Sequence, residues 1–306
     1  MFRKKNQNKS FRLNASLLMS LGRSGSTWLM LLLSKHPSII IDDTYPFENR
    51  TAQYWIHMLN VLGGQAEHDD LIDPNTFYFN EKSISKNPFY NSLYGGQEWF
   101  EHQYRSRFAS FCLDCIDGFY SNLGNVQGKR DPRYFLEKTG PGNSSLRAFR
   151  DLYPQGRLFF LLRDFRDVYA SVSSFNQKHG LSDFGRSFAG SEHDFIRLLE
   201  QSARMLAEAW EATAPFARLV YYEDLVFHPE AVLQELLDFL NLDSSPAVRQ
   251  GMQQRAGRDL AGIGKHATSP DPAGSVQRWK RELSPDIARF CTEVFAEVLG
   301  KFGYAV

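Results

Sequence analysis

The residues best suited to chemistry lie near the start of the chain, in the segment Gly22-Arg-Ser-Gly-Ser-Thr-Trp28. An apolar run over residues 15–20 precedes this segment and another over 29–33 follows it, which predicts a strand, a turn and a helix in that order. The first amides of such a helix lack partners within the helix, and the helix dipole places partial positive charge there. Gly22 and Gly25 let the backbone approach an anion closely, and the hydroxyl groups of the turn can donate to its oxygens. The segment therefore predicts a phosphate-binding loop.

The loop differs from that of nucleoside-triphosphate-binding proteins at the residues that carry their chemistry. Their pattern is G-x-x-x-x-G-K-[ST], in which the lysine reaches the β- and γ-phosphates and the hydroxyl holds magnesium. Here no lysine follows Gly25, and the basic residue, Arg23, comes before it. We therefore expect the loop to bind a phosphate group that is not part of a magnesium-bound triphosphate. For this segment taken alone, a capped helix start is the alternative interpretation.

A second segment predicts a second anion site. Arg157-Leu-Phe-Phe-Leu-Leu-Arg163 places five apolar residues between two arginines, as in a central strand of a parallel sheet. Arg163 then lies at the carboxyl end of that strand, where open α/β sheets bind ligands, and Ser171 lies in the helix that follows. Both side chains can bind one oxyanion. The alternative is that Arg163 forms a structural ion pair with Asp164 or Asp167.

Together these segments resemble the sulfotransferase family, whose members use 3′-phosphoadenosine 5′-phosphosulfate (PAPS) as sulfuryl donor. The segment Arg23-Ser-Gly-Ser-Thr-Trp28 resembles the family's 5′-phosphosulfate loop, and residues 162–171 resemble its 3′-phosphate strand and helix. Tyr221-Tyr-Glu-Asp-Leu225 is similar to the strand whose tyrosine contacts adenine, and Gly274-Ser-Val-Gln-Arg-Trp-Lys280 to the C-terminal loop that closes on the nucleotide. The match is closer to the bacterial and the tyrosyl-protein or carbohydrate branch than to the cytosolic steroid and phenol branch.

The resemblance implies a site for PAPS and for its product, PAP. The donor-binding residues that it implies are Arg23, Ser24, Gly25, Ser26, Thr27, Trp28, Arg163, Ser171, Tyr222, Arg278 and Lys280. Trp28 would stack on adenine, with Tyr222 at the nucleotide's edge; core packing is the alternative for Trp28. Arg23 and Lys138, the latter in Leu136-Glu-Lys-Thr-Gly140, would neutralise charge on the leaving phosphate. Arg23 would act as a fixed charge, whereas Lys138 can also donate a proton.

The resemblance also implies a carboxylate base that removes the acceptor's proton. The apolar triple Ile39-Ile-Ile41 predicts a second strand, and acidic residues follow it. Glu48 fits the base by type and by its Pro-x-Glu-x-Arg setting, and Arg50 would orient it. Asp43 fits better by its count from Arg23, so both remain candidates. Glu48 is favoured because an aspartate directly after a strand often caps the next turn.

Length and composition agree with one catalytic unit. The 306 residues are enough for one large α/β domain, and a formal net charge of zero gives no general argument for nucleic acid as a partner. We expect a basic, disordered arm over residues 1–12 and a single domain over 13–306. The predicted fold is α/β, with three layers like those of P-loop proteins: a central, mostly parallel sheet between helices. An aromatic-rich insertion over 42–133, containing Tyr54, Trp55, Phe77, Tyr78 and Trp99, is expected to cover the acceptor site.

The expected function is transfer of a sulfuryl group to a hydroxyl-bearing acceptor, with a carbohydrate or glycolipid ahead of a small metabolite or a tyrosine. No metal ligand pattern occurs among the eight histidines, so no metal is expected. Three cysteines and the lack of a membrane-spanning run predict a cytoplasmic protein, and the resemblance to the bacterial branch implies a bacterial one. A P-loop kinase acting on a small molecule and a non-catalytic nucleotide-binding module are the alternatives. The sequence gives no prediction of the oligomeric state.

Overall fold

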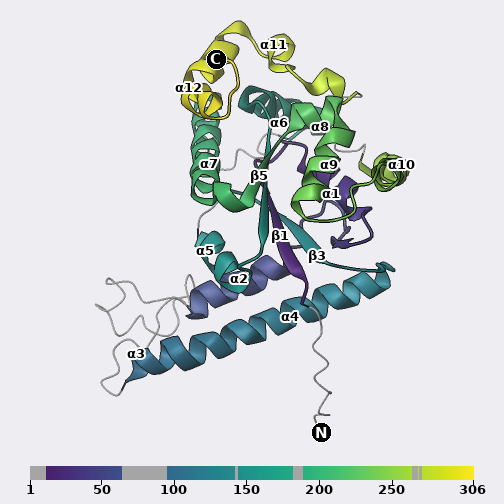
Figure 1. The fold of residues 1–306 in the computed structure, drawn as a ribbon. Coiled ribbons are helices and arrows are strands. Elements are labelled where there is room, and N and C mark those ends of the chain that lie inside the picture. Colours follow the sequence, from purple (N-terminus) through teal and green to yellow (C-terminus); the bar gives the residue numbers. More distant parts are fainter. Residues whose placement is uncertain (1–11, 64–94, 142–143, 182–188, 264–267, 269–270) are drawn as a thin grey trace.

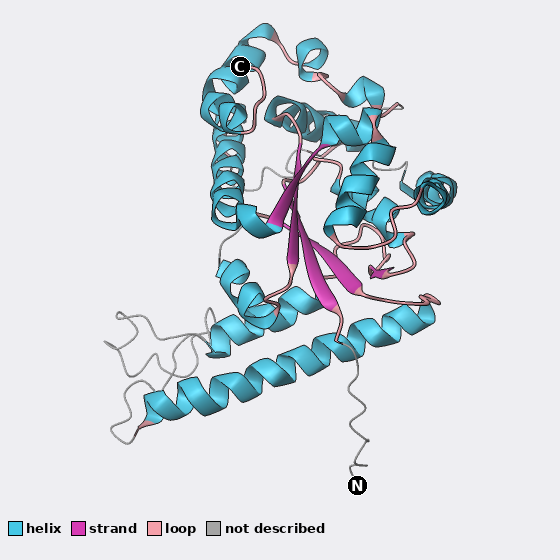
Figure 2. Ribbon diagram, viewed as in Figure 1, coloured by secondary structure: helices cyan, strands magenta, loops and turns pink. Residues whose placement is uncertain are grey.

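The computed structural model describes residues 12–63, 95–141, 144–181, 189–263, 268 and 271–306. Its centre is a five-stranded sheet in the order β2-β3-β1-β4-β5. The strands are β1 (Asn14–Ser20), β2 (Ile39–Ile40), β3 (Tyr134–Thr139), β4 (Arg157–Leu162) and β5 (Ala217–Tyr221). Every pairing is parallel, so the carboxyl ends of all strands lie at one edge of the sheet (Figure 2).

Helices cover both faces of the sheet, which gives three layers (Figure 1). One face packs against α2 (Thr51–Gly63), α4 (Arg105–Val126), α5 (Ser144–Leu152), α6 (Phe165–His179), α7 (Glu192–Thr213) and α12 (Pro285–Lys301). The other packs against α1 (Ser26–Ser34), α8 (Tyr222–Phe227), α9 (Pro229–Phe239) and α10 (Pro246–Ile263). Apolar residues at consecutive positions of β4 are fully buried, as both covered faces require. The predicted three-layer α/β fold is confirmed, with a sheet that is parallel throughout.

One predicted strand is wrong in part. The resemblance implies a strand over residues 221–225, but β5 ends at Tyr221 and α8 begins at Tyr222. Glu223 and Asp224 lie in the first turn of α8, where acidic side chains favour a helix start. Tyr222 is therefore presented from a helix start rather than from a strand.

The described part of the 42–133 segment is mostly helical. Figure 1 shows α4 running across the end of the sheet at which β1 begins, and Arg12 contacts Asp114 on α4 at 3.0 Å. A short helix, α3 (Gly96–Trp99), and a π-helical turn (Phe100–Tyr104) lead into α4. Phe77, Tyr78 and residues 1–11 of the expected arm lie outside the described residues. The acceptor-side role of this segment stays a prediction.

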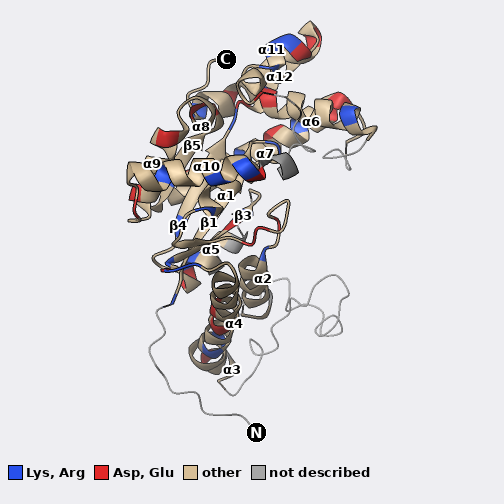
Figure 3. Ribbon diagram, turned by 90° about the vertical axis from the view of Figure 1, so that its right-hand side faces the viewer, with Lys and Arg blue, Asp and Glu red and all other residues tan. Residues whose placement is uncertain are grey.

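Charged residues of both signs occur along the outer helices (Figure 3), in keeping with the net charge of zero. Among the helices in the described ranges, none is both long enough and apolar enough to cross a membrane.

Candidate active site

The start of α1 follows β1 after a short loop and presents backbone amides at the carboxyl edge of the sheet. Gly25 is the N-cap residue, in the left-handed region at φ 89°, and no side-chain cap of the first helix amides is found among the residues that the structure describes. By contrast, side chains cap α6, α7 and α12, namely those of Asp164, Ser191 and Ser284. The first turn of α1 thus keeps uncapped amides and a positive dipole end available for an anion.

Gly25 is required by the packing of Tyr222 as well as by its backbone conformation. A Cβ atom at this position would lie 2.5 Å from Cδ2 of Tyr222, well inside contact distance. The Tyr222 hydroxyl bonds to Oγ of Ser275 at 2.7 Å, and the guanidinium of Arg163 lies 4.5 Å from the centre of the tyrosine ring. These contacts join the predicted loop, the start of α8 and the C-terminal segment.

Three guanidinium groups, those of Arg23, Arg163 and Arg278, gather beside this loop. Arg163 and Arg278 are only 4% and 2% exposed. Arg163 donates through Nη1 to the carbonyl of Arg23 at 3.0 Å and through Nη2 to that of Ser275 at 2.7 Å. Its buried Nε has no hydrogen-bond partner among the described residues. Burial, reinforced by the charges of Arg163 and Arg278, lowers the pKa of Arg23 to about 10. This mutual repulsion favours binding of an anion.

A chain of hydroxyl groups connects two of these arginines. Arg23 donates from Nε to Oγ of Ser171 at 3.3 Å, and that hydroxyl lies 3.3 Å from Oγ1 of Thr268. Arg278 donates to the same Thr268 oxygen at 2.7 Å. The structure therefore brings Arg23, Arg163, Ser171 and Arg278 together; that they bind the donor stays a prediction. Thr268 and Ser275 were missed, although Ser275 lies in the segment that resembles the closing loop.

The expected alternative for Arg163, a structural ion pair, does not describe its contacts. Asp164 caps α6 and pairs with Arg166 at 2.8 Å. Asp167 accepts from the backbone amides of Gln277 and Trp279 at 2.7 and 2.9 Å. These carboxylates fix the helix and the C-terminal segment, while Arg163 donates to backbone carbonyls.

Lys138 connects the other side of the loop to a carboxylate. Its Nζ lies 3.2 Å from Oε1 of Glu48 and 3.4 Å from Oγ1 of Thr27. Lys138 is buried on β3, whereas Glu48 is exposed. Burial lowers the pKa of Lys138, the neighbouring charge of Arg50 acts in the same direction, and Glu48 opposes both. The pair thus places a carboxylate and an ammonium group beside the loop at the start of α1.

The two candidate bases have different surroundings. Asp42, the neighbour of Asp43 and the first residue after the apolar triple, accepts from the amide of Thr44 at 3.1 Å and so caps a turn. Asp43 is exposed, and its charge acts on Lys129, which caps the C-terminal end of α1. Glu48 is the carboxylate that contacts Lys138.

The remaining predicted donor residues differ in how closely they approach this cluster. Ser24 and Ser26 are buried in the loop, at 2% and 9% exposure. Trp28 is partly buried against the hydrophobic cluster on the α1 face of the sheet. Lys280 is exposed and bonds to Oε1 of Gln277 at 3.2 Å, so it is not brought to the arginine cluster.

A shallow pocket of about 370 Å³ opens beside the Glu48 loop. It is lined by Asp42, Asn49, Arg50, Thr51, Tyr54 and Phe119. Asn49 donates to Asp42 at 3.0 Å, which fixes one polar wall. The rings of Tyr54 and Phe119 are 58% and 36% exposed, so apolar surface and hydrogen-bonding groups meet in one hollow.

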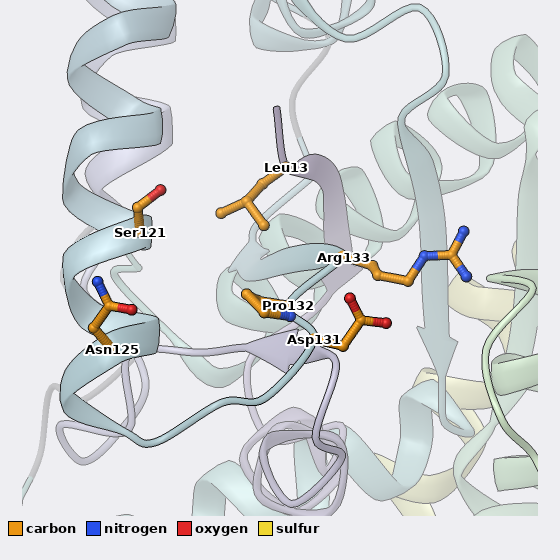
Figure 4. Close-up of a pocket in the computed structure, with 6 residues that line it drawn as sticks. All are labelled: Leu13, Ser121, Asn125, Asp131, Pro132 and Arg133. Atoms are coloured by element: carbon orange, nitrogen blue, oxygen red, sulfur yellow. The ribbon is translucent and has the colours of Figure 1, made fainter. Parts of the chain in front are cut away.

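A larger pocket of about 590 Å³ lies at the opposite edge of the sheet (Figure 4). Its lining residues are Leu13, Ser121, Asn125, Asp131, Pro132 and Arg133. Leu13 and Arg133 directly precede β1 and β3, so this hollow faces the amino ends of the strands. Since open α/β sheets bind ligands at the carboxyl ends, this pocket is not the candidate site.

The fold and the site define a three-layer α/β protein in which β1, a glycine loop and α1 follow one another as in P-loop proteins, but the loop lacks the usual lysine. A family model described as "Sulfotransferase family" matches residues 17–246, and the chain belongs to this family. Carbohydrate sulfotransferase 1 of Mus musculus and of Homo sapiens are 31% and 30% identical over 87 and 89 residues. These matches cover 28% and 29% of this chain, and only 21% and 22% of the length of those relatives.

Solved structures show the same fold. The sulfotransferase domain from the curacin biosynthetic pathway has a TM-score of 0.54 and 18% sequence identity, covering 96% of this chain and 99% of that chain. The sulfotransferase domain from the Synechococcus PCC 7002 olefin synthase has a TM-score of 0.50 and 17% identity, covering 99% and 100%.

Proposed function

We propose that the protein transfers a sulfuryl group from PAPS to a hydroxyl group of a carbohydrate acceptor, without a metal ion. The observation that carries this proposal is the cluster of Arg23, Arg163 and Arg278 around uncapped helix amides, with Glu48 and Lys138 beside the same loop. Membership of the sulfotransferase family supports the reaction type.

The donor would span the two anion-binding segments. The amides and hydroxyls of 24–27 together with Arg23 would hold the 5′-phosphosulfate, and Arg163 and Ser171 would hold the 3′-phosphate. The unpartnered Nε of Arg163 fits this role, since it is a buried donor that a phosphate oxygen would satisfy. Tyr222 and Trp28 would line the adenosine, and Arg278 would close the site through Thr268.

The chemistry needs a base on one side of the sulfur and positive charge on the other. The Glu48 carboxylate would accept the acceptor's hydroxyl proton as the new oxygen–sulfur bond forms. The bond between sulfur and the bridging phosphate oxygen breaks, and PAP leaves with the electron pair. Arg23 and Lys138 would stabilise the charge on that phosphate, usually the largest catalytic contribution. In the structure the Nζ atom of Lys138 already lies near Thr27, in the loop that would hold this phosphate.

The pocket beside Glu48 supports a sugar as acceptor. Its exposed rings, Tyr54 and Phe119, offer flat apolar faces, and Asp42, Asn49 and Arg50 offer fixed polar contacts. This combination suits a hydroxylated ring. The local similarity to carbohydrate sulfotransferase 1 points the same way. A cytoplasmic location is proposed on the three cysteines, which are unpaired.

Calorimetry with PAP in the presence of EDTA tests the donor. We expect binding without metal, because the arginine cluster supplies the positive charge that magnesium would otherwise provide. Binding of ATP only, with magnesium, would instead indicate a kinase. Binding of PAP without transfer of labelled sulfate to any acceptor pool would indicate a nucleotide-binding module.

The acceptor pocket can be tested at Tyr54. We expect Tyr54→Ala to raise the KM for a sugar acceptor by about five-fold, because stacking on an exposed ring contributes about 1 kcal/mol. The affinity for PAP should not change, since Tyr54 lies on α2 and outside the arginine cluster. Kinetics with labelled sulfate would measure the KM for the acceptor, and calorimetry would measure the affinity for PAP. Phe111→Ala, which also removes an exposed ring that contacts Trp55 but is not part of the pocket lining, is the control. Equal effects of the two variants would contradict the assignment.

A further inference from the structure

A buried carboxylate, Glu137, lies directly beside Lys138 on β3 and takes no part in the proposed transfer. Glu137 is 2% exposed, and the three residues of β3 that precede it are apolar. A charged group at this depth is costly unless hydrogen bonds compensate it. The groups that hydrogen bond to Glu137 therefore indicate the role of this buried carboxylate.

Those partners are the N-terminal amides of α2. Glu137 accepts from the backbone of Ala52 at 2.6 Å and of Gln53 at 3.1 Å, and from Nε2 of Gln53 at 2.9 Å. The Tyr120 hydroxyl of α4 donates to the same carboxylate. Ala52 and Gln53 follow Thr51, the first residue of α2, so their amides have no partners within the helix. Glu137 thus caps α2 from a neighbouring strand, where its negative charge also complements the helix dipole.

The neighbouring residue holds the same segment from the other side. Successive side chains of a strand point to opposite faces, so Glu137 meets α2 while Lys138 meets Glu48 and Thr27. The side-chain amide of Gln53 also donates to the carbonyl of Lys138 at 3.1 Å. Two consecutive residues of β3 therefore fix both ends of the short connection from Glu48 to Gln53.

We propose that Glu137 is a positioning residue that holds the Glu48 carboxylate at Lys138 by anchoring the start of α2. The proposal rests on the proposed function, in which Glu48 is the base. It assigns no contact between Glu137 and either substrate. Its effect on the reaction comes entirely through the position of Glu48.

Glu137→Gln is the direct test. Glutamine keeps the size of the side chain, but its amide nitrogen cannot accept, so at least one of the present donors loses its partner. We expect kcat to fall by about ten-fold through misplacement of the base. The affinity for PAP, measured by calorimetry, should stay unchanged, because the arginine cluster lies on other elements. Ser191→Ala is the matched control, since it removes the N-cap of α7 without touching the Glu48 segment.

A double-mutant cycle separates positioning from a general loss of stability. If Glu137 acts through Glu48, then Glu48→Gln should cost several-fold less in the Glu137→Gln background than in the native protein. Multiplicative losses of the two changes would overturn the proposal. No effect of Glu48→Gln by itself would show instead that the assignment of the base is wrong.

Hydrogen exchange supplies a readout that does not depend on activity. In Glu137→Gln, amides of residues 48–58 should exchange about ten-fold faster, while those of 20–34 keep their protection. Gln53→Ala, which removes only the side-chain contacts, should give a smaller increase in the same peptides and serves if the first variant does not fold. Unchanged exchange over 48–58 would overturn the proposal whether or not the native protein transfers sulfate.

Discussion

Glu48→Gln is expected to lower the rate of sulfuryl transfer by about a hundred-fold or more, as the loss of a general base does. The amide cannot take the acceptor's proton, although it keeps the size and exposure of the carboxylate. The affinity for PAP should remain close to native, because Glu48 contacts Lys138 and not the arginine cluster. Transfer of labelled sulfate, combined with calorimetry for PAP, measures the two quantities separately.

Asp43→Asn is the matched control for that result. It removes the same charge from the same loop, but Asp43 is exposed and its charge acts on Lys129, not on Lys138. We expect a small effect on turnover. If the asparagine variant loses activity and Glu48→Gln does not, Asp43 is the base and the ion pair of Glu48 with Lys138 is structural.

Arg163→Ala is expected to weaken PAP binding by about thirty-fold or more, since a charged hydrogen bond to phosphate contributes about 2–3 kcal/mol. Adenosine 5′-phosphate, which lacks the 3′-phosphate, should lose much less. A smaller, shared loss is expected for both nucleotides, because Arg163 also donates to the carbonyls of Arg23 and Ser275. Calorimetry with both nucleotides measures how much more affinity the variant loses for PAP than for adenosine 5′-phosphate.

Arg289→Ala provides the comparison for charge removal alone. Arg289 is largely exposed on α12 and forms a loose pair with Asp286 at 3.8 Å. Its loss should leave the affinity for both nucleotides unchanged. Equal losses for the two nucleotides in Arg163→Ala would mean that Arg163 only supports the loop backbone.

Much of the fold follows from local sequence patterns. The buried runs of β1 and β4 and the loop before α1 are continuous in sequence, so periodicity and turn residues were enough to predict them. The end of β5 was harder, because Tyr222 continues an apolar run while its real neighbours, Gly25 and Ser275, lie far away in sequence. Its helical conformation depends on those tertiary contacts.

The site was predictable only where its residues are close together in the sequence. The loop and the Arg163 strand carry their chemistry in short motifs, and the resemblance to a family joined them. Glu137 lies within such a motif, but its role depends on Ala52 and Tyr120, which no spacing rule connects to it. A carboxylate within an apolar strand was nevertheless a usable signal, since buried charges require partners.

The crowding of Arg23, Arg163 and Arg278 has a consequence for work with the purified protein. Any small tetrahedral oxyanion that enters this cluster relieves the same repulsion as the donor, and so raises the melting temperature with its concentration. If the cluster binds the donor as proposed, we expect phosphate or sulfate buffers to compete with PAP, so that affinities measured in them are apparent values that fall as the buffer becomes more concentrated. The same ions make useful additives for storage and crystallisation of the nucleotide-free form.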